Sequence, residues 1–149
     1  MRWVKKLTRI ITTPASERVN FNIASINQGH HFITYRGIPT LRCPFDYVMY
    51  QMILSEIKPD LVIEIGTNKG GTTLYLANLM DVIGVGTIHS IDIQPINAEI
   101  VKNHPRIKLF TKGWQDYDIL EAEKFKRILV IEDASHVYED SIGSLNKFS

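Results

Sequence analysis

Residues 61–72 combine a short apolar run, an acidic residue and a glycine-rich turn. The run Leu61–Ile65 is rich in Val and Ile, as are strands buried on both faces of a parallel sheet. Gly66, Gly70 and Gly71 follow, and they allow a tight turn with close approach of the backbone to a ligand. Residues 72–81 then show helical periodicity, so the turn lies at a helix N-terminus, which favours an anionic group. The stretch predicts a strand, turn and helix that bind a nucleotide-like cofactor.

The spacing of these glycines differs from the common phosphate-binding patterns. Gly66 is followed by three residues and then Gly70-Gly71, which is neither G-x-G-x-x-G nor G-x-x-x-x-G-K-[ST]. Glu64 precedes the turn, and Asp92 ends the next apolar run, 21 residues after Gly71. At that distance Asp92 can accept hydrogen bonds from ribose hydroxyls at the carboxyl edge of the sheet. The arrangement favours S-adenosylmethionine over a dinucleotide or ATP, and a tight turn without a ligand is the alternative.

Helical and strand patterns alternate from residue 46 onward. A helix is predicted at 46–57, and Lys58-Pro59 ends it. Its apolar stripe consists of Phe45, Val48, Met49, Met52, Ile53 and Ile57. Strands are expected near 61–65, 87–92, 107–111 and 127–132, with helices near 72–81, 95–103, 116–124 and 137–147. This alternation predicts an α/β fold with a parallel sheet and helices on both faces, whereas residues 14–44 show little periodicity and predict a lid or connecting arm.

Composition narrows the class of protein. The 149 residues fit one domain, and the formal net charge of +1 gives no overall signature of nucleic-acid binding. The single Cys43 cannot form an intrachain disulfide. No apolar run approaches the roughly 20 residues that span a bilayer. We therefore expect a cytoplasmic protein without a nucleic-acid partner.

The first 20 residues carry five Lys or Arg against one Glu. Apolar residues recur among residues 1–12 at the spacing of a short basic amphipathic helix. Packing on the domain, or fraying, is favoured over membrane contact, because so short a helix is marginal in water. We treat 1–34 as an N-terminal arm and 35–149 as the cofactor-binding domain.

A second polar cluster, Glu132-Asp133-Ala134-Ser135-His136, follows the fourth predicted strand. It lies just past the carboxyl end of that strand, where open α/β sheets bind ligands. Asp133 and His136 are candidates for a divalent-cation site or for holding a substrate hydroxyl, and carboxylate oxygens suit Mg²⁺. The alternative is a polar loop in which Asp133 caps the next helix and His136 is solvated.

Four motifs lie in order along residues 35–149: Tyr35-Arg36-Gly37-Ile38-Pro39, Cys43-Pro44-Phe45-Asp46, the stretch from Glu64 to Thr72, and Asp133-Ala134-Ser135-His136. Together they resemble the cephalosporin hydroxylase/rhamnosyl O-methyltransferase family. The resemblance implies the Rossmann-like fold of class I S-adenosylmethionine-dependent methyltransferases. It also implies an O-methyltransferase with a small-molecule acceptor, a hydroxyl of a sugar or secondary metabolite, and with Mg²⁺ at the acceptor site.

The resemblance also implies roles for single residues. It assigns to the methionine end of the cofactor Glu64, Gly66, Thr67, Asn68, Gly70 and Gly71. Asp92 corresponds to the ribose ligand, and Gly113 to a glycine beside the adenine pocket. Asp133 corresponds to the first metal-ligating acid, and His136 to a histidine that is a candidate general base.

The sequence departs from the family at its end. The family's sheet has seven strands in the order 3-2-1-4-5-7-6, whereas this sequence stops after the helix that follows the fourth predicted strand. A further metal-binding Glu-Asp pair, expected after the fifth strand, is missing. We therefore expect an incomplete domain of about four strands with an exposed edge at 127–132, which favours self-association or a homo-oligomer. A cofactor-binding or interaction remnant without turnover is the alternative function, and an NAD-binding module is a weaker third.

Overall fold

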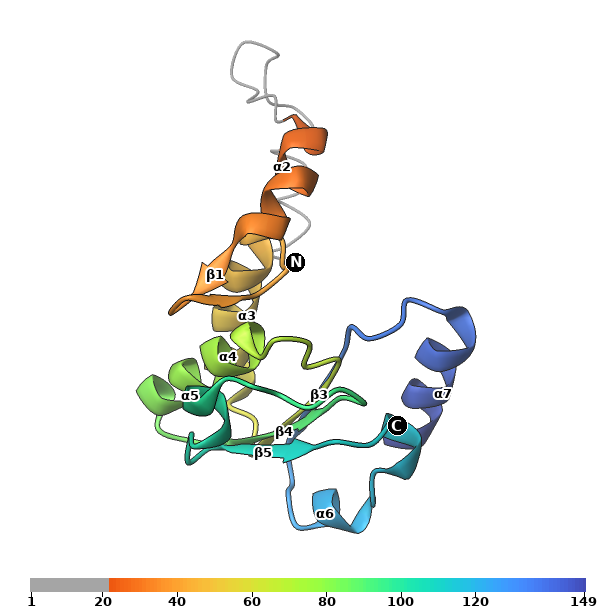
Figure 1. Cartoon of the computed structure of the whole chain (residues 1–149). Helices are drawn as coiled ribbons and strands as arrows, with labels where there is room; N and C mark the ends of the chain where they lie inside the picture. Colours follow the sequence, from red (N-terminus) through yellow and green to blue (C-terminus); the bar gives the residue numbers. More distant parts are fainter. Residues whose placement is uncertain (1–21) are drawn as a thin grey trace, which may run out of the picture.

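The computed structural model describes residues 22–149, so the prediction for residues 1–12 lies outside the described part. Four parallel strands form the main sheet in the order β5-β4-β3-β6. They are β5 (Ile107–Phe110), β4 (Thr87–Ile91), β3 (Leu61–Ile65) and β6 (Ile128–Glu132). Helices cover both faces of this sheet (Figure 1). The predicted α/β fold is confirmed.

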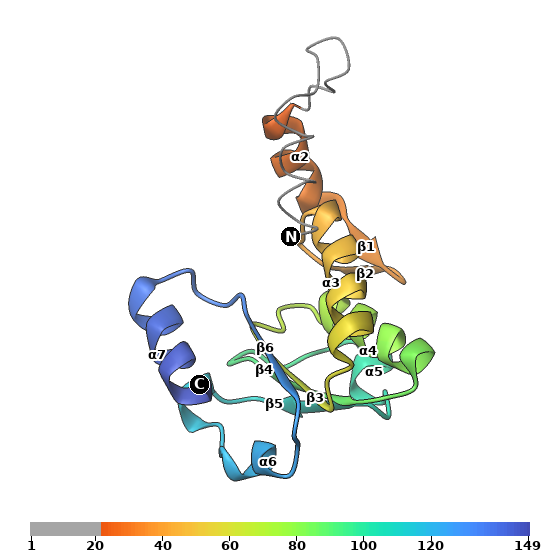
Figure 2. The ribbon, with the colours of Figure 1, turned by 180° about the vertical axis from the view of Figure 1, so that it is seen from behind.

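The core consists of two apolar layers, one on each face of the sheet. All five residues of β3 are buried, and successive side chains alternate between the layers. Val62 packs with residues of α3 (Pro44–Ile57) and α4 (Gly71–Ile83). Leu61 and Ile63 pack on the opposite face with residues of α6 (Leu120–Glu123) and α7 (Tyr138–Phe148). Figure 2 shows α3 and α4 on one side of the sheet, with α6 and α7 on the other. The central strand therefore has the two-sided burial that its sequence predicts.

Two predicted helices are shorter in the structure. In place of 95–103, α5 covers Glu99–Lys102, because residues 92–98 form a loop in which the Gln94 N–H donates to Asp92 Oδ1 at 2.8 Å. In place of 116–124, a 3₁₀ turn η3 (Trp114–Asp116) is separated from α6 by the extended and buried Tyr117. The other predicted strands and helices begin and end within two residues of the expected positions.

The described part of the predicted lid, residues 22–44, is more regular than expected. It contains α2 (Ile23–Gly29), the 3₁₀ turn η2 (His30–Phe32) and a hairpin of β1 (Thr34–Tyr35) and β2 (Ile38–Pro39). Asn22 Oδ1 caps α2 by accepting from the Ala24 N–H at 3.0 Å. Arg36 and Gly37 have φ values of 52° and 81°, as both central residues of a type I′ hairpin turn require. Gly37 thus makes a hairpin rather than breaking the structure.

Helix α3 turns a different face to the sheet than its apolar stripe predicts. Leu54 is its buried residue, whereas Val48, Met49 and Met52 are about half exposed, as is Phe45. The Tyr75 hydroxyl of α4 donates to the Tyr47 carbonyl at 2.8 Å, and the two rings meet edge to face. These tyrosine contacts join α3 to α4, and much of the apolar stripe is directed outward.

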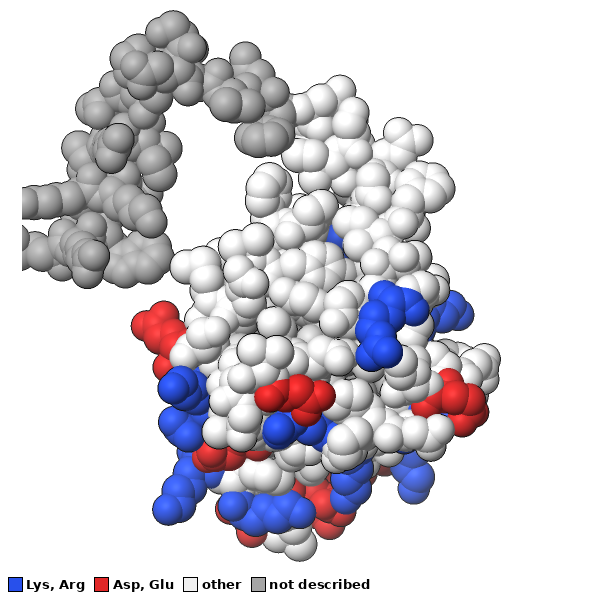
Figure 3. All heavy atoms as spheres, turned by 90° about the vertical axis from the view of Figure 1, so that its left-hand side faces the viewer, with Lys and Arg blue, Asp and Glu red and all other residues white. Residues whose placement is uncertain are grey.

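No helix in residues 22–149 is both long enough and apolar enough to cross a membrane. Figure 3 shows acidic and basic side chains interspersed over the lower part of one face, with few charges on the upper part.

The buried His89 makes stability depend on pH. Its Nδ1 lies 2.6 Å from the Tyr117 hydroxyl, and its ring packs against Phe110 and Phe125. Burial, reinforced by the charge of Lys108, lowers the pKa of His89 to about 4. Since the unfolded chain titrates near pH 6.5, the neutral imidazole stabilises the fold fully above that pH. The contribution is lost as the pH falls from about 6.5 to about 4.

As the pH falls from about 6.5 to about 4, we expect the titration of His89 to lower the free energy of unfolding by up to roughly 3 kcal/mol. His89→Gln keeps a hydrogen-bonding side chain but does not titrate. Urea unfolding at pH 7 and pH 4.5 should therefore show a smaller loss of stability in this variant than in the wild type. Equal losses in the two proteins would contradict the prediction.

Candidate cofactor-binding site

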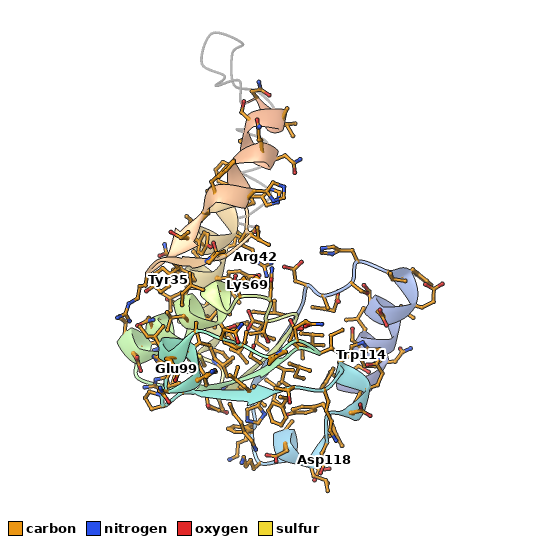
Figure 4. All side chains as sticks on the ribbon, viewed as in Figure 1. Tyr35, Arg42, Lys69, Glu99, Trp114 and Asp118 are labelled. Atoms are coloured by element: carbon orange, nitrogen blue, oxygen red, sulfur yellow. The ribbon has the colours of Figure 1, made fainter. Side chains whose placement is uncertain are left out.

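A cleft of about 1030 Å³ opens where the strands of the main sheet end at their carboxyl edge. Its lining comes from residues 37–42 after β1, the glycine turn after β3, the loop 91–98 after β4, residues 113–115, and residues 133–136 after β6. In Figure 4, Arg42 and Lys69 lie on the hairpin side of the cleft, and Trp114 lies near α7. The volume and the place in the sheet are those of a small-molecule site.

Eight of the ten predicted site residues line this cleft: Gly66, Thr67, Asn68, Gly71, Asp92, Gly113, Asp133 and His136. Glu64 and Gly70 lie outside its lining. The fold therefore gathers predicted site residues that are up to 70 positions apart in the sequence around one opening.

Two of the glycines allow chain segments to approach each other at the cleft. Gly66 has a φ of 99°, and a Cβ on it would overlap the Asp133 carbonyl oxygen and lie 2.9 Å from Ala134 Cα. A Cβ on Gly71 would overlap the Pro39 carbonyl oxygen and the Thr40 methyl group. The glycine turn is therefore packed against the loop after β6 on one side and against the hairpin on the other.

Asp92 ties the glycine turn to the loop after β4. Its Oδ2 accepts from the Asn68 N–H at 2.7 Å, and its Oδ1 accepts from the Gln94 N–H at 2.8 Å. Asn68 adopts a φ of 51°, which aims this N–H at the carboxylate. Each carboxylate oxygen can accept a further hydrogen bond. Asp92 is thus held rigidly while it keeps acceptor capacity for a hydroxyl.

Glu64 lies behind the cleft wall rather than in it. Its side chain is fully buried, and its Oε2 accepts from the Thr73 and Ser90 hydroxyls at 2.5 and 2.7 Å. Oε1 has no hydrogen-bond partner in residues 22–149. Burial raises the pKa of Glu64, and the two hydroxyls and the Arg42 charge oppose that rise.

Glu64 reaches the cleft through a chain of hydroxyls, because Ser90 Oγ lies 2.6 Å from Thr67 Oγ1. In this structure Glu64 supports the glycine turn through these hydroxyls, and its direct contact with a cofactor stays a prediction. Thr73 and Ser90 are not among the predicted site residues. Polar residues within a buried apolar run, such as Ser90, are the signal that could have found them.

An ion pair joins two sides of the cleft. Arg42 Nη2 lies 2.6 Å from Asp133 Oδ2, and its guanidinium carbon lies 5.4 Å from the centroid of the Tyr50 ring. Burial is the main reason that the pKa of Tyr50 is raised to about 12, so the ring stays neutral. Arg42 is not among the predicted site residues, because a single Arg in an irregular segment carries no diagnostic pattern.

His136 sits at the exposed rim of the cleft. Its side chain is 77% exposed, and its Nδ1 lies 3.9 Å from Asp133 Oδ1, beyond hydrogen-bond range. The alternative in which Asp133 caps α7 is wrong: the Val137 N–H instead donates to Ser135 Oγ at 3.3 Å. The Ser135 hydroxyl donates in turn to Asp140 Oδ2 at 2.6 Å.

A preformed Mg²⁺ site is not found in residues 22–149, where no three His, Cys, Asp or Glu side chains come together. Asp133 has one oxygen paired with Arg42. Glu132 accepts from the Ala134 N–H and the Ser141 hydroxyl, both at 3.2 Å. Mg²⁺ demands a near-octahedral shell of oxygens. The described donor set does not fit that shell.

A family model, rhamnosyl O-methyltransferase/CmcI, matches residues 28–149. The chain belongs to this family. The resemblance seen in the sequence motifs is therefore confirmed.

Curated family members match over short segments. The rhamnosyl O-methyltransferase of Mycobacterium tuberculosis (strain H37Rv) is 51% identical over 51 residues, which cover 34% of this chain and 21% of that protein. That of Mycobacterium leprae is 39% identical over 75 residues, which cover 50% of this chain and 33% of that protein. The chain thus spans about a third or less of the curated relatives it matches.

Solved structures of CmcI share the fold. A CmcI structure with SAH matches with a TM-score of 0.63 and 18% identity, covering 95% of this chain and 64% of that chain. A CmcI structure with Mg-SAM matches with a TM-score of 0.59 and 20% identity, covering 93% of this chain and 58% of that chain. At this level of identity the likeness shows the methyltransferase fold.

Proposed function

We propose that the cleft binds S-adenosylmethionine and that the chain takes part in transferring the cofactor's methyl group to a hydroxyl of a sugar or secondary metabolite. The observation that carries the proposal is the Asp92 carboxylate, which the Asn68 and Gln94 N–H groups hold beside the glycine turn. Membership of a family that includes rhamnosyl O-methyltransferases supports the reaction, and solved CmcI structures with SAH and with Mg-SAM support the cofactor.

The ribose, the methionine end and the adenine of the cofactor would each contact a different part of the cleft lining. The ribose hydroxyls would donate to Asp92. The methionine end would lie over the turn after Gly66, where the exposed Lys69 ammonium complements its carboxylate. The adenine would cover Ile93, an apolar side chain that lines the cleft yet is 70% exposed, next to Gly113.

The transfer itself is a direct displacement. Bound S-adenosylmethionine would supply the methyl group: the acceptor oxygen would bond to the methyl carbon as the carbon–sulfur bond breaks, the electron pair would stay on sulfur, and a base would take the hydroxyl proton. His136 is the candidate base because it stands at the cleft rim. Holding acceptor and cofactor in line supplies much of the rate. A solved CmcI structure with Mg-SAM supports Mg²⁺, and binding this ion at Asp133 would need ligands beyond the described residues.

A second candidate is a cofactor-binding piece without turnover of its own. The observation in its favour is that the chain spans about a third or less of the curated relatives it matches. Both candidates require S-adenosylmethionine in the cleft, so cofactor binding is the first property to test.

We expect Asp92→Ala to weaken S-adenosylmethionine binding by roughly 0.5–3 kcal/mol, because hydrogen bonds from the ribose are lost and the glycine turn loses its anchor. Titration calorimetry measures the change. Glu56→Ala, which removes an exposed carboxylate from α3, is the matched control and should bind as the wild type does. Equal affinities of wild type and Asp92→Ala, or tighter binding of NAD, would count against the proposal.

A further inference from the structure

The ion pair of Arg42 and Asp133 engages the carboxylate that the family resemblance assigns to a metal ion. The distance of 2.6 Å between Arg42 Nη2 and Asp133 Oδ2 is that of a strong charge-assisted hydrogen bond. A divalent cation on this oxygen would occupy the space that the guanidinium fills, and the two positive charges would repel each other. Arg42 and a cation therefore compete for Oδ2.

Arg42 is also held by its surroundings. Its side chain is 11% exposed, it lies over the Tyr50 ring, and its Nε is buried without a hydrogen-bond partner in the described residues. A buried guanidinium requires a counter-charge, and within residues 22–149 Asp133 is the carboxylate that forms an ion pair with it. Taking Asp133 away would leave this charge buried and unpaired, which opposes cation binding.

Two of the acids near this end of the cleft are already engaged as hydrogen-bond acceptors, and burial disfavours the charged form of a third, Glu64. Glu132 accepts from the Ala134 N–H and the Ser141 hydroxyl, and Asp140 accepts from the Ser135 hydroxyl. His136 is mostly exposed and lies 3.9 Å from the other oxygen of Asp133. The charge at this end of the cleft is therefore balanced within the pair.

We infer that Arg42 is the resident counter-ion of Asp133 and competes with divalent cations for its carboxylate. Arg42 thus balances the charge of Asp133, and a cation that binds this carboxylate through Oδ2 must compete with the guanidinium. The inference rests on the proposed function only for identifying this end of the cleft as the acceptor site. The competition between Arg42 and a cation depends on the Arg42 and Asp133 side chains alone.

Mn²⁺ binding, followed by the electron paramagnetic resonance of the free ion without S-adenosylmethionine, tests the competition. We expect Arg42→Gln to bind Mn²⁺ on the order of tenfold or more tightly than the wild type. Lys126→Gln is the matched control, since it removes an exposed cation outside the cleft lining that has no ion pair in the described part of the chain, and it should change the affinity little. Adding Asp133→Asn to Arg42→Gln should abolish the gain.

Arg42→Lys extends the test if Arg42→Gln folds poorly by circular dichroism. It keeps the charge but lacks the planar fork of the guanidinium, so its Mn²⁺ affinity should lie between those of the other two proteins. Wild-type affinity in both Arg42 variants, or tight Mn²⁺ binding by the wild type that Asp133→Asn removes, would overturn the inference. Failure of the wild type to bind S-adenosylmethionine would count against the proposed function instead.

Discussion

Gly66→Ala should destabilise the fold and abolish cofactor binding together. Its φ of 99° is a conformation that alanine adopts with strain, and the new Cβ would overlap the Asp133 carbonyl oxygen. Backbone strain and overpacking cost roughly 1–3 kcal/mol each, so we expect a loss of about 2–6 kcal/mol in the free energy of unfolding. Relief of the overlap requires the glycine turn and the loop after β6 to separate, which deforms the cleft.

Gly84→Ala is the matched control for this experiment. Gly84 has a similar φ of 83° at the end of α4, but no atom lies within 4 Å of the position of its Cβ. The Gly84→Ala variant should lose only the free energy of unfolding that backbone strain costs, roughly 1–3 kcal/mol. It should bind S-adenosylmethionine as the wild type does. Urea unfolding and calorimetry measure both properties. Equal destabilisation by the two substitutions would show that the approach of Asp133 to Gly66 has no energetic weight.

Glu64→Ala should cost about 2–4 kcal/mol of stability, because Thr73 and Ser90 lose their shared acceptor and a buried cavity remains. The hydroxyl chain through Ser90 to Thr67 also loses its anchor, so S-adenosylmethionine affinity should fall. Glu64→Gln keeps a carbonyl oxygen for both hydroxyls and should retain most of the stability and most of the affinity. Chemical unfolding and calorimetry distinguish the two variants.

The pH dependence of Glu64 provides an independent check. Burial raises the pKa of Glu64 in the folded protein, so its protonated form stabilises the fold. That contribution is complete below the ordinary pKa of a glutamic acid and is lost as the pH rises through the folded-state pKa. Glu64→Gln should therefore gain stability relative to the wild type as the pH rises. A loss of affinity in Glu64→Gln as large as in Glu64→Ala would instead indicate an ionised Glu64 that contacts the cofactor.

Much of the fold could be predicted because local pattern and tertiary burial agree. The run Leu61–Ile65 is apolar at every position but one, and it is the central strand, where both faces are covered. Prediction was wrong where tertiary structure interrupts a helical pattern. In place of the helices predicted at 95–103 and 116–124, α5 covers Glu99–Lys102 and α6 covers Leu120–Glu123.

The sequence by itself determined the parallel sheet, the glycine turn and the acids that follow the strands, because each depends on residue types at short spacing. Tertiary structure alone decided what those groups touch. It buried Glu64 behind Ser90 and Thr73, and it left Asp92 at the cleft with two backbone donors. It also brought Arg42, 91 residues away, onto Asp133. Such pairings depend on how segments that are distant in the sequence pack against the same edge of the sheet. Local sequence patterns do not predict which of these segments come into contact.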